Sequence, residues 1–252
     1  MTSASTPMAD RVAAEIERSL LGSEISIGAK LPSERELAVQ FGVSRPVVRE
    51  ALRRLQERGL VEAQPGRGTF FRPADPSDAA GSLNRLFRRY SVTPGELVVA
   101  RKMLECEGAA LAAIHRTDED CQTLERLLEG LSGKPTVLEQ AKLDLAFHDH
   151  IARASRNPVI HLMFASISDL TVGLMVRSLS DRQVSQRGLP FHDEVLDAVV
   201  ERDPERARRA MGDHLGTAEE LYGADLDRSI SDLVPAELRA ALDVLPGLQV
   251  AG

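Results

Sequence analysis

The stretch that decides the fold is residues 28–71, GAKLPSERELAVQFGVSRPVVREALRRLQERGLVEAQPGRGTFF. Residues 33–36, SERE, form a capping box, in which the serine hydroxyl accepts from a free backbone N–H and the second glutamate reaches back to the cap. It predicts a short helix that ends near Gly42. Ser44 is then predicted to cap a second helix, which Gly59 ends.

The second of these helices is basic on one side and apolar on the other. Arg45, Arg49 and Arg53 recur every four residues, so they share one face. The opposite face carries the apolar residues Val48, Ala51, Leu52 and Leu55. One face can pack into a core while the other enters the major groove of DNA. An arginine-rich face can also be no more than solvated surface, so the neighbouring elements decide between the two interpretations.

After the second helix the pattern changes to that of a β-hairpin. Residues 60–64 and 69–72 are two strand-like runs around the turn Pro65-Gly66-Arg67-Gly68. Two short helices followed by a hairpin are typical of a winged helix-turn-helix. Arg35 begins the first helix and Arg67 lies at the hairpin tip. Both are candidate DNA contacts, since the arginine fork pairs with phosphates or guanine edges.

The composition places the chain among ordinary globular proteins. Of its 252 residues, 43% are hydrophobic and 27% charged, which excludes a disordered or fibrous chain. Two cysteines are too few for a secreted disulfide scaffold, so we expect a reducing compartment. We find neither an apolar run of about 18 residues nor a signal-peptide pattern, and expect a cytoplasmic protein with no membrane partner.

The net charge of −7 would by itself argue against a nucleic-acid partner, but it is an average over two different regions. Residues 1–75 hold eleven Lys and Arg against ten Asp and Glu, a charge of +1. Residues 76–252 hold twenty against twenty-eight, a charge of −8. The acidic excess therefore belongs to the C-terminal region.

Residues 73–77, PADPS, interrupt all periodicity and predict a boundary between domains 1–75 and 76–223. Beyond it, the sequence signals helix starts at Thr93, Thr117, Pro135, Asn157 and Asp203. Six or seven helices without a convincing strand predict an all-helical bundle. We therefore expect a mainly α fold, in which a winged helix-turn-helix precedes a helical bundle.

Four polar residues of the bundle have a spacing that suits a metal ion. Asp144 and His148 are four apart on one predicted helix, while His192 and His214 lie on later helices. One carboxylate and three imidazoles would bind Zn²⁺, Mn²⁺ or Ni²⁺ and leave coordination positions open. By spacing alone, four residues scattered over about seventy positions can also coincide by chance, since most histidines are ordinary core or surface residues.

The quoted stretch resembles the DNA-binding domain of GntR-family transcriptional regulators, through LPSERELA, GVSRPVVREAL and GRGTF. The resemblance implies a homodimer on a palindromic double-stranded operator. It also implies that operator DNA is contacted by Arg35, Ser44, Arg45, Arg49 and Gly66, with Arg67 as a wing contact. Arg53 is added from helix geometry alone.

Residues 101–222 resemble the FCD ligand-binding domain of the FadR subfamily of these regulators. The matching segments are Arg101-x-x-x-Glu105 leading into GAALAA, DLAFHDHIARASRNPVI, and HDEVLDAVVERDPERARRAMGDHL. The resemblance implies a divalent transition metal held by Asp144, His148, His192 and His214, and no ligand role for His115, His150 or His161. It further implies a small carboxylate effector beside the metal, with Arg101 as its anchor and Arg177 as a second candidate.

The sequence departs from the family pattern at its end. Residues 224–252 continue beyond the usual limit of the FCD domain and have no assigned role. Pro235 to Leu245 are expected to form a short amphipathic helical segment.

The leading hypothesis is a repressor whose operator affinity is controlled by a metabolite. One alternative is a metal-dependent hydrolase or lyase with an appended DNA-binding domain, which substrate turnover would reveal. Another is a purely structural metal, which would leave ligand binding intact after chelation.

Overall fold

The computed structural model describes residues 7–22, 25–73, 83, 86–87, 89–133, 136–180 and 182–234. The chain divides into two compact units, Met1–Asp78 and Ala79–Gly252. Each unit has its own hydrophobic core. Four of the five residues of the predicted boundary segment 73–77, residues 74–77, lie outside the described residues. The predicted helical segment from Pro235 to Leu245 lies outside them as well.

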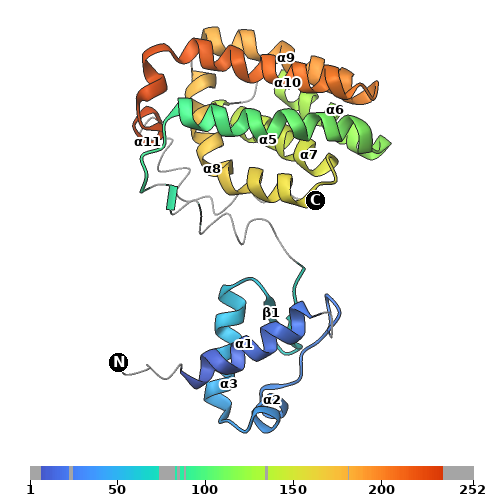
Figure 1. The fold of residues 1–252 in the computed structure, drawn as a ribbon, viewed down its shortest axis with the longest axis vertical. Helices are drawn as coiled ribbons and strands as arrows, with labels where there is room; N and C mark the ends of the chain where they lie inside the picture. The colour runs from blue at the N-terminus through green and yellow to red at the C-terminus, as the bar shows by residue number, and fades with distance from the viewer. Residues whose placement is uncertain are drawn as a thin grey trace. The chain divides into compact units, whose positions relative to one another are not determined.

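The described residues of the N-terminal unit form three helices and a hairpin (Figure 1). They are α1 (Met8–Leu21), α2 (Glu34–Phe41), α3 (Arg45–Glu57), β1 (Val61–Gln64) and β2 (Gly68–Phe71). The strands are antiparallel, with Val61 opposite Phe71. Gly66 and Gly68 adopt the positive φ values of 73° and 118° that the tight turn requires. The predicted winged helix-turn-helix is confirmed.

The two sides of α3 differ as its sequence predicts. Val48, Ala51 and Leu55 are fully buried against α1, while Arg45 and Arg49 are exposed. Burying a side chain of the size of valine or leucine contributes about 1.5–3 kcal/mol, so the apolar stripe fixes the direction in which the basic face points.

Helices α2 and α3 are capped differently at their N-termini. The predicted capping box is present, since the Ser33 hydroxyl accepts from the Glu36 amide at 3.3 Å and the Glu36 carboxylate accepts from the Ser33 amide at 2.8 Å. The predicted side-chain cap at Ser44 is wrong, because this hydroxyl makes no capping bond. Instead, the Val47 amide donates to the backbone carbonyl of Ser44 at 3.0 Å.

The C-terminal unit is an all-helical bundle, as predicted, and its described residues contain no strand. Its long helices are α5 (Pro94–His115), α6 (Asp118–Ser132), α7 (Val137–Ala154), α8 (Pro158–Ser180), α9 (Arg182–Val200) and α10 (Pro204–Tyr222). The predicted starts at Thr93, Thr117, Asn157 and Asp203 are confirmed, because each side chain accepts from a backbone amide of the first turn. Thr136 caps α7, next to Pro135, which lies outside the described residues.

Helix α5 is in contact with α7, α8, α9 and α10, and runs beside α10 along most of its length (Figure 1). Helix α8 is the one described helix long and apolar enough to cross a membrane, but half of that apolar stretch is buried within the bundle. Its Phe164 and Leu174 belong to the core. Gly108 of α5 lies against Ile160 of α8, where an added Cβ would make an ordinary van der Waals contact at 3.5 Å.

The segment after α10 folds back onto the beginning of α5. It contains the 3₁₀ helix η1 (Gly223–Asp227) and the short α11 (Ile230–Leu233). The Ile230 amide donates to the carbonyl of Val92 at 2.9 Å, and Ile230 and Val234 are buried. The first part of the predicted extension is therefore packed as part of the bundle.

Candidate metal centre and nucleic-acid interface

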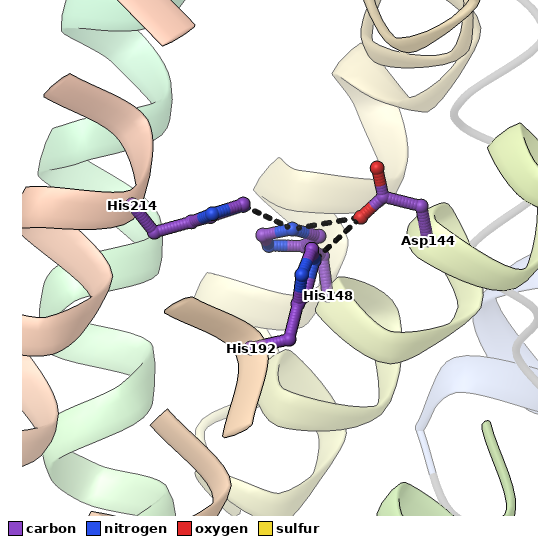
Figure 2. Close-up of side chains that lie close together, drawn as sticks. All are labelled: Asp144, His148, His192 and His214. Atoms are coloured by element: carbon purple, nitrogen blue, oxygen red, sulfur yellow. Dashed lines mark hydrogen bonds and ion pairs between the residues drawn. The ribbon is translucent and has the colours of Figure 1, made fainter. Parts of the chain in front are cut away.

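Four side chains from three helices of the bundle converge on one point (Figure 2). Asp144 and His148 project from the same face of α7, because they are one helical turn apart. His192 comes from α9 and His214 from α10. The first three side chains are buried and His214 is partly exposed. The spacing along α7 brings two of the four side chains together, and the packing of α9 and α10 brings in the other two.

The distances within this group suit a metal ion. Oδ1 of Asp144 lies 2.8 Å from Nε2 of His192 and 3.3 Å from Nε2 of His148. Nε2 of His214 lies 3.2 Å from Nε2 of His148. A metal–ligand distance of about 2.0–2.2 Å places neighbouring ligand atoms roughly 3 to 3.5 Å apart. The four donor types and their separations therefore fit a divalent transition metal.

The protonation states of two of these residues also fit. Burial alone would raise the pKa of the Asp144 carboxyl, but its contacts with His192 and His148 hold that pKa well below the usual value. Burial and the nearby imidazoles of His192 and His148 lower the pKa of His214 well below its usual value. An anionic carboxylate and a neutral imidazole are the forms that bind a metal.

Glu105 of α5 contacts this group through His148. Its carboxylate contacts Nδ1 of His148, which leaves Nε2 of that ring facing the other three ligands. The same carboxylate accepts from Nε of Arg101 at 2.5 Å and from Nη2 at 3.2 Å. Burial would raise the pKa of Glu105, but Arg101 and His148 outweigh it and lower the pKa to about 2. A carboxylate behind a ligating histidine fixes both its tautomer and its orientation.

Glu105 was not predicted as a site residue. The available signal was its position four residues after Arg101, within a helix whose neighbouring residues are mostly apolar. Both side chains are buried, Arg101 at 4% and Glu105 at 3% exposure. A buried charge is costly unless it is paired, and here each side chain supplies the partner of the other.

The N-terminal unit presents all seven predicted DNA contacts on its surface. Exposed residues are Arg35, Ser44, Arg45, Arg49, Arg53, Gly66 and Arg67. The arginines of α3 have acidic partners: Arg49 pairs with Glu34 of α2, and Arg53 pairs with Glu50 of its own helix. The Arg67 guanidinium lies 5.7 Å from the centre of the Phe70 ring. All seven predicted contacts are thus accessible to a ligand.

Both units match known families. Residues 8–71 match bacterial regulatory proteins of the gntR family, and residues 96–217 match the FCD domain. The chain is 33% identical over 248 residues to the Glc operon transcriptional activator of Escherichia coli K12, covering 92% of this chain and 96% of that protein. This chain belongs to the GntR family. Its FCD domain places it in the FadR-like subfamily.

Other GntR regulators are similar over most of their length. The chain is 30% identical to the HTH-type transcriptional regulator LutR of Bacillus subtilis, covering 82% of this chain and 97% of that protein. It is 29% identical to the HTH-type transcriptional repressor NanR of Salmonella newport, covering 86% of each. Among solved structures, Streptococcus agalactiae GntR has a TM-score of 0.61 and 28% identity, covering 84% of this chain and 99% of that one.

Within the FCD domain, the two predicted effector residues have different surroundings. Arg101 is held by Glu105, which also contacts His148 of the candidate metal group. Arg177 of α8 pairs with Asp225 of η1 at 2.7 Å, and its guanidinium lies 5.2 Å from the centre of the Tyr222 ring. The structure therefore brings Arg101 to the group of ligands and ties Arg177 to the segment after α10.

Near Arg177, Tyr222 and Ser178 form a polar contact that the sequence did not indicate. The Tyr222 hydroxyl and the Ser178 Oγ are 2.7 Å apart. Burial raises the pKa of Tyr222, although the charges of Arg101 and Arg177 act in the opposite direction. These residues are 44 positions apart in the sequence, and only the packing of α8 on the end of α10 brings them together.

Two further histidines of the FCD domain have partners of their own. Nε2 of His150 lies 3.1 Å from Oδ1 of Asp120, and Nε2 of His161 lies 3.2 Å from Oδ1 of Asp149. Neither histidine belongs to the converging group of four. His115 lies in the last turn of α5. All three serve as control positions for experiments on the metal centre.

Replacing Glu105 with glutamine should weaken metal binding by about 10- to 100-fold, because Nδ1 of His148 would lose its anionic partner. Competition with a chromophoric chelator measures this affinity. Glu107→Gln is the matched control, since Glu107 lies on the same helix but pairs with Arg208 on the surface. Equal metal affinity in the two variants, with both folded by circular dichroism, would show that Glu105 does not tune the site.

Proposed function

We propose that this protein is a repressor that binds double-stranded operator DNA as a homodimer and responds to a small carboxylate metabolite. The metabolite binds beside a divalent transition metal, Zn²⁺, Ni²⁺ or Mn²⁺, in the FCD domain. The observation that carries this proposal is the convergence of Asp144 and three histidines in a bundle that shares its chain with a winged helix-turn-helix.

Asp144, His148, His192 and His214 would hold the ion. Four protein ligands leave open positions on a five- or six-coordinate metal, where a carboxylate oxygen can bind. Arg101 would add a guanidinium beside that position. Glu105 accepts from its Nε and Nη2 and so holds the guanidinium in place. Arg177 is the second candidate anchor, through its proximity to Tyr222.

On the DNA side, the exposed face of α3 would enter the major groove. Arg45, Arg49 and Arg53 lie on that face, and Ser44 precedes it. Arg35 and the hairpin tip at Gly66 and Arg67 would contact the flanking backbone. A dimer would present two such faces to the two halves of a palindromic operator.

The effector would act by preferring one arrangement of the two DNA-binding units over another. A ligand shifts such an equilibrium only through a difference in its affinity for the two arrangements. We assign repression as the sign of regulation, and a reporter gene placed behind the operator measures it. Both signs occur among the relatives, an activator and a repressor.

The decisive experiment titrates metal-loaded protein with small carboxylic acids and follows operator affinity by fluorescence anisotropy. We expect at least one acid to bind and to change the operator affinity by about 5- to 150-fold, the usual range of allosteric coupling. Acids that bind without changing operator affinity would contradict the mechanism. Ligand binding that survives removal of the metal by a chelator would instead indicate a purely structural ion.

We also propose that the protein is cytoplasmic and is not an enzyme. Glu105, the carboxylate next to the ligands, is held by Arg101 and His148, so it is not free to act as a general base. Turnover of a candidate acid by the metal-loaded protein, detected by mass spectrometry, would contradict this assignment.

A further inference from the structure

Two exposed arginines at the start of α3, Arg45 and Arg49, lie against a carboxylate that belongs to a different helix. Glu34 is the first residue of α2, directly after the Ser33 cap. Its Oε1 accepts from Nε of Arg49 at 3.0 Å, and its Oε2 accepts from Nη2 at 2.9 Å. Nη2 of Arg45 lies 3.8 Å from the same Oε2. Glu34 therefore links the two helices of the helix-turn-helix through the side chains that face outward.

The geometry of this pair leaves one side of the guanidinium available. Arginine presents two N–H pairs, one along Nε and Nη2 and the other along Nη1 and Nη2. Glu34 uses the first pair. No described residue hydrogen-bonds to Nη1 of Arg49. The outer pair is thus free to bind two acceptors, and O6 and N7 of guanine in the major groove have the matching spacing.

A purely stabilising role does not account for the pair. The Arg49 side chain is 68% exposed and that of Glu34 is 30% exposed, and ion pairs at such positions add little to stability. Arg53, by contrast, pairs with Glu50 and Glu57 of its own helix. What the Glu34 contact does is restrict a long side chain that would otherwise sample many rotamers, and preorganisation of this kind strengthens binding to one defined target.

We propose that Glu34 is a positioning residue that holds the Arg49 guanidinium in the orientation that reads a guanine, and so contributes to operator specificity. This inference rests on the proposed role of Arg49 in the major groove. It makes a prediction opposite to that of simple electrostatics. A carboxylate near DNA repels phosphates, so its removal would strengthen binding to every sequence alike if it did nothing else. If Glu34 positions Arg49, its removal lowers the preference for the operator.

The test compares Glu34→Gln with Glu17→Gln in the full-length protein. Glu17 of α1 also has a 30% exposed side chain and also pairs with an arginine, Arg58, so the two variants make the same charge change. The probes are the duplex that the wild-type protein selects from a random library and a scrambled duplex of the same composition. We expect Glu34→Gln to lower the ratio of the two affinities by about 3- to 10-fold, and Glu17→Gln to leave it unchanged.

A double-mutant cycle with Arg49→Ala separates this inference from the proposed function. Once Arg49 is absent, Glu34→Gln should have no further effect on the affinity ratio. A loss of ratio with Glu34→Gln that persists without Arg49 would overturn the positioning role, as would tighter binding to both duplexes at an unchanged ratio. If Arg49→Ala itself has no effect on operator binding, the groove assignment fails first, and the inference falls with it.

Discussion

Purified protein in which His148 and His214 are both replaced with alanine should contain almost no divalent metal, whereas the wild-type protein should contain about one ion per chain. The substitution removes two of four converging ligands, and the remaining pair, Asp144 and His192, cannot hold a transition metal against dilution. Elemental analysis after gel filtration in metal-free buffer measures the stoichiometry.

The matched control replaces His150 and His161, which lie on α7 and α8 outside the group of four. Their removal should leave the metal content at the wild-type value. His148 is fully buried, so thermal unfolding of each variant must also be recorded. Wild-type metal content in the folded His148 and His214 variant would mean that the ion is bound elsewhere.

Replacing Arg49 with alanine should weaken operator binding by about 1–3 kcal/mol for each protomer bound to the DNA, which is about 5- to 150-fold. The loss follows from removing a bidentate contact to a base edge. The melting temperature of the C-terminal bundle should not change, because Arg49 belongs to the separate N-terminal unit. Gel shifts with specific and scrambled duplexes measure the binding.

Arg58→Ala provides the comparison. Arg58 directly follows α3, is exposed and pairs with Glu17, so the charge change is the same at a position outside the predicted contact face. Its effect should be small and equal for both duplexes, as expected for a general electrostatic contribution. A normal gel shift by Arg49→Ala would refute the groove assignment.

The winged helix-turn-helix was predictable because its signals are local. The capping box at Ser33, the apolar stripe through Val48 and the glycines of the hairpin each act within a few residues. The prediction failed at the Ser44 hydroxyl, because the Val47 amide donates to the backbone carbonyl of Ser44 instead. Sequence indicated where α3 begins but not which oxygen would accept.

The metal centre was predictable only in part from spacing. Asp144 and His148 were recognisable as a pair because one helix fixes their relation. His192 and His214 were candidates from their places on later helices, but only the family resemblance favoured a shared site over chance. Spacing alone does not show that α9 and α10 bring them to Asp144 and His148. No start was predicted for α9, although Ser180 and Asp181 directly precede it. Glu105 and Tyr222 come near the site only through packing between helices.

The backbone contact between Val92 and Ile230 has a practical consequence for dissecting this protein. The FCD match ends at residue 217, yet Tyr222, Ile230 and Val234 complete the apolar cluster around α8. A fragment cut at the limits of the match, residues 96–217, would lose the cap of α5 at Thr93 together with these three members of the cluster. The packed bundle therefore extends beyond the matched residues at both ends, and an excised domain should include Thr93 at one end and Val234 at the other.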